Sequence, residues 1–332
     1  MSVQITIVGL GQIGSSIGLA LKAHNVDVHC VGHDKSPEVA KESQKAGAVD
    51  DVKYNLPASI YEAKIVILAL PLAAVRETLE IIAPDLQEGT LVLDTAPAKA
   101  TVAAWAKELL PPGRFYIGLI PAINPEYLRG AEYGVKSARA DLFQKGLMVV
   151  NTPSGIPGNM FDLAMDLVKL LGALPLLMDT AEADGVFSAT HVLPQLAAAA
   201  LLDTTVDRPG WLEARKLAGR PYATATAGAG DHDDVLSLGE SALENRENVV
   251  RLLNTYIASL IDLRDEIEAS DREALRKRLE EAFKGRSRWL DERSGAEWLQ
   301  VESQHTTVPT FGERLQQTFL GGFATDRQKR RK

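Results

Sequence analysis

The sequence predicts an α/β protein, a doubly wound parallel sheet followed by an all-helical domain, and three observations lead to this prediction. Up to about residue 180, short apolar and β-branched runs alternate with helical segments. A glycine-rich turn directly follows the first of these runs. Beyond residue 180 strand signals stop, and apolar residues recur every three or four positions, as in packed helices. We expect domains at residues 1–180 and 181–300, with a C-terminal extension at 301–332.

The first βα unit carries the glycine pattern. Residues 3–8 form a β-branched run that predicts a buried parallel strand, and residues 13–21 have helical spacing. Between them, Gly9 permits a tight turn, Gly11 lets the backbone approach a pyrophosphate, and Gly14 allows helix and strand to pack closely. The N-terminus of such a helix presents free N–H groups to an anion. Because the pattern has a strand before it and a helix after it, it predicts a Rossmann-type dinucleotide-binding domain.

An acidic residue ends the second predicted strand. Asp34 follows residues 28–32 and lies twenty positions after Gly14. At this spacing a carboxylate accepts hydrogen bonds from the adenine ribose and repels a 2′-phosphate, which favours NAD over NADP. NADP remains an alternative because neighbouring side chains, His33 among them, can bind a phosphate. The alternative for Asp34 itself is a solvated turn residue.

The remaining predicted strands are apolar nearly throughout, so we expect helices on both faces of the sheet. These strands are at residues 65–70, 90–94, 116–120, 147–151 and 174–178. Ligands of such a sheet bind beyond the carboxyl ends of the strands, which here means the loops at residues 70–71, 94–99 and 120–126. The residues expected to contact the cofactor are Gly9, Gly11, Gln12, Ile13, Gly14, His33, Asp34, Leu70, Pro71, Thr95 and Ala96.

One apolar stripe dominates the helical part of the chain. A stripe of this length packs against other helices, either within the chain or across a dimer. Ser270 and Glu273 have the spacing of a capping box at the start of the next helix. We therefore expect a homodimer formed through the helical domain. The stripe consists of Leu243, Val250, Leu253, Ile257, Leu260 and Ile267.

The composition is that of a soluble globular protein, since 45% of the 332 residues are hydrophobic and 24% are charged. A net charge of −8 disfavours nucleic-acid binding, and the basic residues 324–332 are expected to be a frayed, solvated terminus. The longest apolar run, residues 65–75, is too short to span a membrane. With one cysteine, Cys30, and a first strand that leaves no room for a signal peptide, we expect a cytoplasmic protein.

Several segments carry a resemblance to a known family. They are the glycine loop with Asp34, residues 68–71 (LALP), 94–99 (DTAPAK), 118–126 (GLIPAINPE), 190–191 (TH) and 245–248 (NREN). Together they resemble the prephenate and arogenate dehydrogenase family, over roughly residues 1–289. The resemblance implies an N-terminal dinucleotide domain and a helical dimerisation domain. It also implies oxidative decarboxylation of a cyclohexadienol in tyrosine biosynthesis, with the segment at residues 68–71 passing under the nicotinamide.

Three family positions have changed in the part that handles the substrate. The family's catalytic histidine precedes Pro121, where this chain has Ile120, and an isoleucine accepts no proton. The family serine before Lys99 corresponds to Pro97. The family's substrate arginine belongs in a segment like residues 223–226 (ATAT), which holds none. Together these changes predict poor or absent turnover of prephenate and arogenate.

Three side chains are candidates for catalysis. Lys99 can orient a substrate carboxylate or be a solvated lysine at a helix start. Asn124 can donate to a carbonyl or hydroxyl, or be a turn residue before a proline. His191 opens the first long helix of the helical domain and can exchange a proton near neutral pH, or it is a hydrogen-bonded core residue. We expect no metal site, and residues 231–234 (DHDD) are interpreted as acidic helix capping.

Three functions are open from the sequence. The first is an NAD(P)-dependent dehydrogenase or reductase that acts on a changed small-molecule substrate. The second is a genuine prephenate or arogenate dehydrogenase. The third is a non-catalytic NAD-binding sensor, a pseudoenzyme built on the same scaffold. We expect a small-molecule substrate and a homodimeric partner, and neither a nucleic acid nor a membrane.

Overall fold

The computed structural model describes residues 2–128, 132–229, 235–296 and 310–320. The chain forms two compact units, of which the first comprises Met1–Thr180 together with Trp289–Lys332, and the second is Ala181–Arg288. The helical unit thus ends earlier than the range of 181–300 expected from the sequence. The chain returns to the first unit because its C-terminal helix buries Phe311 and Leu315 in the core of that unit.

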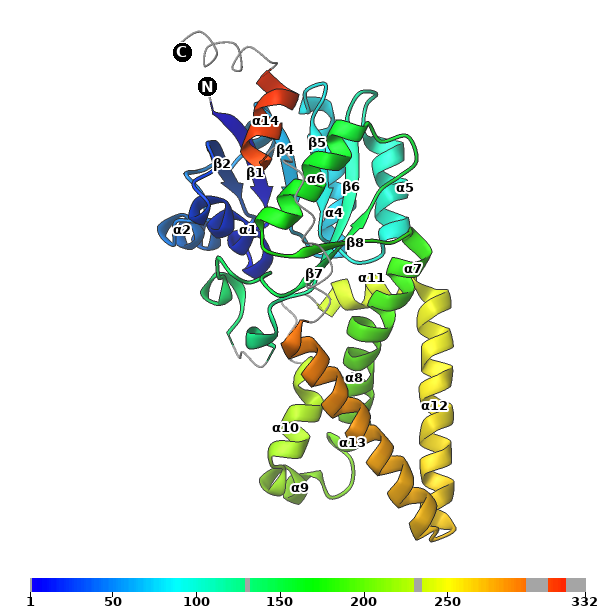
Figure 1. The fold of residues 1–332 in the computed structure, drawn as a ribbon. Helices are drawn as coiled ribbons and strands as arrows, with labels where there is room; N and C mark the ends of the chain where they lie inside the picture. The colour runs from blue at the N-terminus through cyan, green and yellow to red at the C-terminus, as the bar shows by residue number, and fades with distance from the viewer. Residues whose placement is uncertain (1, 129–131, 230–234, 297–309, 321–332) are drawn as a thin grey trace. The chain divides into compact units, whose positions relative to one another are not determined.

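An eight-stranded sheet forms the centre of the first unit, in the order β3-β2-β1-β4-β5-β6-β7-β8 (Figure 1). All neighbouring strands are parallel except β6 and β7, which run antiparallel. The predicted doubly wound sheet is confirmed, with this one reversal and a two-residue strand that the sequence pattern did not reveal. The strands are β1 Val3–Val8, β2 Val28–His33, β3 Asp51–Val52, β4 Ala63–Leu68, β5 Leu91–Asp94, β6 Phe115–Pro121, β7 Leu147–Asn151 and β8 Leu174–Leu177.

Helices cover both faces of the sheet, as the continuous apolar strands require. Successive strand residues point to opposite faces, so Ile65 and Ile67 pack with α1 and α6, while Val66 and Leu68 pack with α4 and α5. Helix α14 lies beside α6 and β1 and completes the first of these layers (Figure 1). The helices are α1 Gln12–Ala23, α2 Pro37–Lys45, α3 Leu56–Ile60, α4 Leu72–Ile82, α5 Lys99–Leu109, α6 Gly158–Leu170 and α14 Phe311–Leu320.

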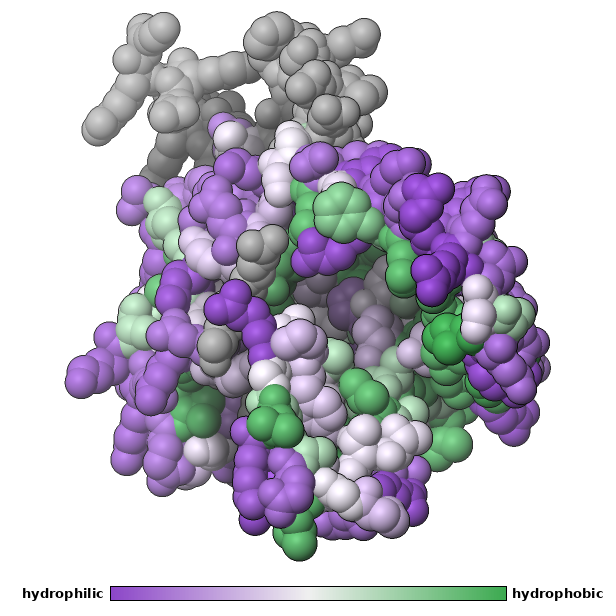
Figure 2. All heavy atoms as spheres, turned by 90° about the horizontal axis from the view of Figure 1, so that it is seen from below, coloured by the Kyte–Doolittle hydropathy of each residue, from purple (hydrophilic) through white to green (hydrophobic). Residues whose placement is uncertain are grey.

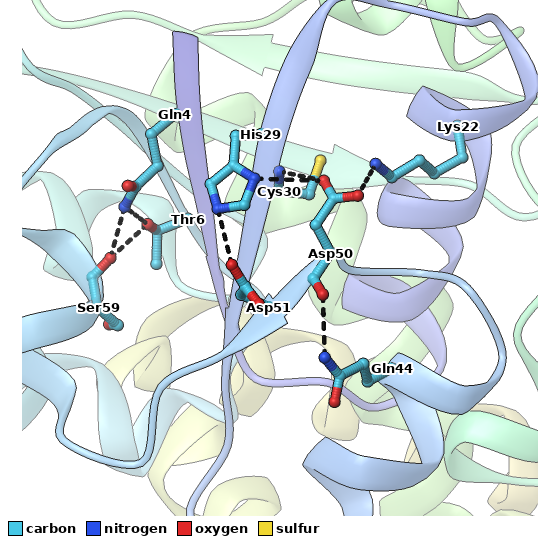
Figure 3. A network of polar contacts seen from close by, with 9 residues as sticks. All are labelled: Gln4, Thr6, Lys22, His29, Cys30, Gln44, Asp50, Asp51 and Ser59. Atoms are coloured by element: carbon cyan, nitrogen blue, oxygen red, sulfur yellow. Dashed lines mark hydrogen bonds and ion pairs between the residues drawn. The ribbon is translucent and has the colours of Figure 1, made fainter. Parts of the chain in front are cut away.

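A polar network joins α1, β2 and β3 in the first unit (Figure 3). The Asp50 carboxylate pairs with Lys22 and accepts a hydrogen bond of 2.8 Å from the backbone N–H of Cys30. His29 Nε2 lies 3.1 Å from a carboxylate oxygen of Asp51. Burial raises the pKa of Asp50, but the hydrogen bonds from Lys22 and Cys30 outweigh it and leave this pKa below its ordinary value. The ionised Asp50 carboxylate therefore links α1 and β2 to the residue that precedes β3.

The described residues of the second unit form helices and connecting turns, without a strand. A single π-helical turn, Ser188–Val192, joins α7 to α8. The predicted capping box at Ser270 does not form, because the helix begins one residue later and Asp271 accepts the N–H of Ala274 at 3.0 Å. The helices are α7 Thr180–Phe187, α8 Leu193–Thr205, α9 Trp211–Leu217, α10 Arg220–Thr226, α11 Val235–Glu244, α12 Arg246–Glu268 and α13 Arg272–Gly295, the last of which ends in the first unit.

Large apolar side chains lie open on the helical unit. Most of the predicted stripe is exposed, including Val250, Ile257 and Leu260 on α12. Figure 2 shows such hydrophobic side chains in green on the face seen from below.

By length and composition alone, one helical run among the described residues, Thr180–Thr205, could cross a membrane. An apolar surface of this kind suits contact with a second protein chain as well as with lipid.

Candidate functional site

The glycine loop after β1 has the geometry that a pyrophosphate requires. Gly9 adopts a φ of +91°, and a Cβ added to it meets the carbonyl oxygen of Ala69 at 2.3 Å. A Cβ on Gly14 meets the carbonyl oxygen of Gly9 at 1.9 Å, so helix and loop touch through this glycine. At Gly11, by contrast, no described atom lies within 4 Å of an added Cβ. Gly11 therefore faces open space, where a ligand's phosphates can approach the backbone.

Helix α1 begins at this loop and points its N-terminus at the same space. Gly11 is the N-cap residue, no side-chain hydrogen bond from a described residue caps the helix, and the first turn carries no acidic residue. The N–H groups of the first turn therefore stay available to an anion. Ile13 packs against the core, and Gln12 Nε2 makes a long contact of 3.4 Å with the carbonyl of Ser137.

Asp34 holds the loop from the end of β2. One carboxylate oxygen accepts the N–H of Leu10 at 2.8 Å, and the other accepts the N–H of Ser36 at 2.9 Å. Each oxygen has a second lone pair, so the half-buried carboxylate keeps acceptor capacity for ribose hydroxyls. It is thus not only a solvated turn residue. Neighbouring His33 is anchored through Nδ1, 2.8 Å from the carbonyl of Lys53.

The loops after β4 and β5 meet the glycine loop at one edge of the sheet. Val8, Leu68 and Asp94 are register neighbours on β1, β4 and β5, so the residues that follow them lie side by side. Thr95 extends this pairing with its N–H, 2.9 Å from the Leu68 carbonyl. Ala96 is buried, whereas Thr95 and Leu70 are half-buried and Pro71 is exposed. The predicted cofactor residues are therefore brought together along the carboxyl ends of three adjacent strands.

Lys99 is neither solvated nor open to a ligand. Its side chain is fully buried, and Nζ donates to a carboxylate oxygen of Asp94 at 2.8 Å and to the Asp94 carbonyl at 3.1 Å. Tyr116 donates its hydroxyl to the same carboxylate at 2.6 Å. The other Asp94 oxygen accepts the N–H of Ala96 at 2.7 Å. Lys99 therefore supports the loop after β5. In this structure it is neither a lysine free to orient a substrate carboxylate nor a solvated lysine at a helix start, because its side chain is buried and bonded to Asp94.

Asn124 is committed to its own loop. It is buried, its Oδ1 accepts the N–H of Glu126 at 3.1 Å, and its Nδ2 donates to the carbonyl of Asp141 at 3.3 Å. Both ends of the amide thus stabilise the turn after β6, which matches the turn-residue interpretation. The sequence alone could not reveal this, because Asp141 is distant along the chain and reaches Asn124 only through the fold.

His191 lies in the π-helical turn of the second unit. Its ring stacks on Phe187 with a centroid distance of 4.3 Å, and Nδ1 lies 2.9 Å from Thr190 Oγ1. The Thr190 hydroxyl donates to the Val186 carbonyl at 2.9 Å, so this network assigns the proton to Nδ1 and leaves Nε2 an acceptor. Although the residue keeps an exposed surface, burial of the ring lowers the pKa of His191 below 6.5.

Asn245, the first residue of the family-like segment at 245–248, supports this π-helical turn. Asn245 Nδ2 donates to the Asp184 carbonyl at 2.7 Å and lies 2.6 Å from Ser188 Oγ. Asn248 in turn donates to Asn245 Oδ1 at 2.8 Å. Single π turns are frequent at functional sites. The amide pair holds such a turn in place around His191.

A metal site is not formed by the described residues, since no group of three or more His, Cys, Asp and Glu side chains is placed to hold an ion. Residues 231–234, interpreted as helix capping, lie outside the described residues, as do the basic residues 324–332.

Comparisons with known proteins place this geometry in a family. Two family models match the chain, "Prephenate dehydrogenase, nucleotide-binding domain" at residues 17–175 and "Prephenate dehydrogenase, dimerization domain" at residues 179–281. The chain is 26% identical to the cyclohexadienyl dehydrogenase of Zymomonas mobilis over 285 residues, which are 85% of this chain and 94% of that protein. It is 25% identical to the prephenate dehydrogenase of Bacillus subtilis over 280 residues, 82% of this chain and 72% of that protein.

A solved structure shares the fold. The prephenate dehydrogenase of A. aeolicus, in complex with hydroxyphenyl propionate and NAD+, superposes with a TM-score of 0.75 at 22% identity. The match covers 87% of this chain and 98% of that one.

Proposed function

Because the chain belongs to the prephenate dehydrogenase family and is an NAD-dependent oxidoreductase, we propose that it oxidises a small hydroxy compound other than prephenate, with His191 as the proton acceptor. The observation that supports this proposal is Ile120, at the position where the resemblance places the family's catalytic histidine, because an isoleucine accepts no proton. The loop around Gly11 and Asp34 has the geometry of a dinucleotide site, which supports the cofactor part of the proposal.

The residues present fit NAD. Gly9, Gly11 and Gly14 allow the pyrophosphate to approach the N-terminus of α1, and Asp34 has acceptor capacity for the adenine ribose. A carboxylate at this position also repels the 2′-phosphate of NADP, so we propose NAD as the preferred cofactor. When bound, NAD supplies the hydride acceptor.

His191 supplies the proton acceptor in this proposal. As the C–H hydride leaves the substrate carbon, the hydroxyl becomes a carbonyl and its proton moves to His191 Nε2. The lowered pKa keeps this imidazole neutral at pH 7, as a general base requires. Stacking on Phe187 and the bond to Thr190 hold the ring in one orientation.

The experiment is a substrate panel read at the NADH absorbance band. Prephenate, arogenate and a set of 2-hydroxy and 3-hydroxy acids are offered with NAD to the wild type, to His191→Asn and to the control His24→Asn at the end of α1. We expect turnover of a panel compound other than prephenate, lost in His191→Asn by about 10²–10⁴-fold and kept in the control. Retained turnover in His191→Asn removes this residue from the mechanism.

The pH profile adds a second test of the same base. Because the neutral imidazole is the active form, kcat/KM should fall as the pH drops through the His191 pKa, which lies below 6.5, and level off above it. No such acidic limb should remain in the residual activity of His191→Asn.

A second candidate is a genuine prephenate or arogenate dehydrogenase, and the names of its relatives favour it. Turnover of prephenate or arogenate above that of every other panel compound would establish it. NAD binding by calorimetry without turnover of any compound supports a sensor instead, and absence of NAD binding refutes the proposed cofactor.

A further inference from the structure

In the first unit, backbone hydrogen bonds join the loop after β6 to the turn before β7. Ala122 donates its N–H to the Leu147 carbonyl at 2.8 Å, and Asn124 donates its N–H to the Leu142 carbonyl at 2.5 Å. An added Cβ on Gly146 meets the Ala122 carbonyl oxygen at 2.2 Å, so the two segments touch through their backbones. Lys145 adopts a φ of +58° at this point. The two segments therefore form one tightly fitted structure.

This structure lies at the edge of the sheet where ligands of doubly wound folds bind. It follows the position of Ile120 and includes most of the segment at residues 118–126 that resembles the family's substrate side.

A guanidinium in the last turn of α13 binds one backbone carbonyl of each segment. Arg293 donates from Nη2 to the Ile123 carbonyl at 2.5 Å and makes a longer contact from Nη1 to the Lys145 carbonyl at 3.4 Å. The side chain is half-buried, and burial lowers the pKa of the guanidinium. Its fork thus spans both segments, which a single ammonium cannot do with the same geometry.

Arg293 lies beyond the matched family models, which end at residue 281. The chain around it belongs to the first unit, to which α14 is fastened by buried apolar residues and by ion pairs of Arg314 with Asp162 and Asp166. The end of α13 and helix α14 therefore both pack as parts of the first unit.

We propose that Arg293 is a positioning residue that fixes the loop after β6, and through it the substrate side of the site. The simpler role is a basic residue in the last turn of a helix, where any cation interacts favourably with the helix dipole. The two roles differ in what a lysine can replace. A lysine restores the charge at the helix end but not the bridge between two carbonyls.

The experiment uses the full chain with Arg293→Met and Arg293→Lys, and Arg288→Met as the control, an exposed arginine on the same helix. Amide hydrogen exchange at residues 122–127 should speed up by about tenfold in both Arg293 variants and stay unchanged in the control. The NAD affinity and the thermal midpoint should stay close to wild type. Full protection in Arg293→Lys, or unchanged exchange in Arg293→Met, overturns the inference.

A kinetic arm rests on the proposed function and uses the panel compound with the highest wild-type rate. In both variants we expect KM for this compound to rise, and the factor of this rise should be about ten times the factor by which kcat falls. An equal loss of kcat, NAD affinity and thermal midpoint assigns Arg293 to stability alone and contradicts the inference. If the wild type turns over no panel compound, the proposed function fails, and hydrogen exchange by itself decides the role of Arg293.

Discussion

Gly11 and Gly14 belong to the same sequence pattern, but the structure requires glycine at the two positions for different reasons. Gly14 is required by packing, because a Cβ there overlaps the Gly9 carbonyl. Gly11 has φ −73°, which any residue adopts, and no described atom occupies the space beside it. Its constraint therefore comes from a ligand rather than from the chain.

Gly11→Ala should accordingly separate binding from stability. We expect the thermal midpoint to move by no more than about 2 °C, while the dissociation constant for NAD rises about tenfold or more, since the methyl group occupies the phosphate space. Gly14→Ala is the matched comparison and should lose stability and NAD binding together. Calorimetric NAD titration and thermal unfolding measure both quantities. Unchanged NAD affinity in Gly11→Ala contradicts a pyrophosphate at this loop.

The single cysteine gives a second prediction at this scale. Cys30 is fully buried in β2, and burial, opposed by Lys22 and reinforced by Asp50, raises its pKa to about 11. Because the thiolate is the reactive form, roughly one thiol in a thousand is reactive at pH 8. The native protein should resist dithionitrobenzoate, and the unfolded protein should react with one equivalent. Rapid reaction of the native protein would show that β2 opens readily.

At the scale of elements, α14 is a helix whose role its sequence does not disclose. A capping box starts it, with Thr310 N–H donating to Glu313 at 2.8 Å and Glu313 N–H donating to Thr310 Oγ1 at 3.3 Å. Leu315 is 1% exposed and belongs to the same core as β1 and α6. This short helix is therefore part of the sheet unit although residues 181–288 separate the two in the chain.

Leu315→Ala should destabilise the first unit by about 2–5 kcal/mol, the usual effect of truncating a buried leucine. Gln317→Ala, on the exposed side of the same helix, should change stability by less than about 0.5 kcal/mol. Urea unfolding followed in the first unit measures both. Equal, small effects of the two variants would mean that α14 does not contribute to the core in solution.

At the scale of the whole molecule, the exposed stripe on α12 points to self-association. The chain carries the family's dimerization domain, and Val250, Ile257 and Leu260 are about half exposed in a single chain. An apolar face of this length is unusual on a monomer. We therefore expect a homodimer formed through the helical unit.

Light scattering should give twice the chain mass of 35.9 kDa at micromolar concentration. Leu260→Asp should shift the protein towards the monomer, because an unpaired charge is costly in an apolar interface. Thr255→Asp adds the same charge at an exposed position on the opposite side of the helix from the stripe and should leave the dimer intact. A monomeric wild type refutes the prediction, and so does an equal effect of both variants.

The sequence by itself determined the features that depend on local spacing. The glycine loop, Asp34, seven of the eight strands and the apolar stripe all follow from periodicity and turn chemistry, which act over a few residues. The same reasoning missed the two-residue β3 and the reversal at β7, because strand direction is set by pairing and not by composition.

Only the tertiary structure decided what distant residues do to one another. It brought Tyr116 to the Asp94 carboxylate that Lys99 also binds, turned the Asn124 amide onto Asp141, and brought Arg293 to the Ile123 carbonyl. Each of these contacts joins groups whose partners are fixed by packing, and no local pattern specifies them. Whether a polar side chain serves a ligand or its own fold depends on those partners, since a donor already held by the chain is not offered to a substrate.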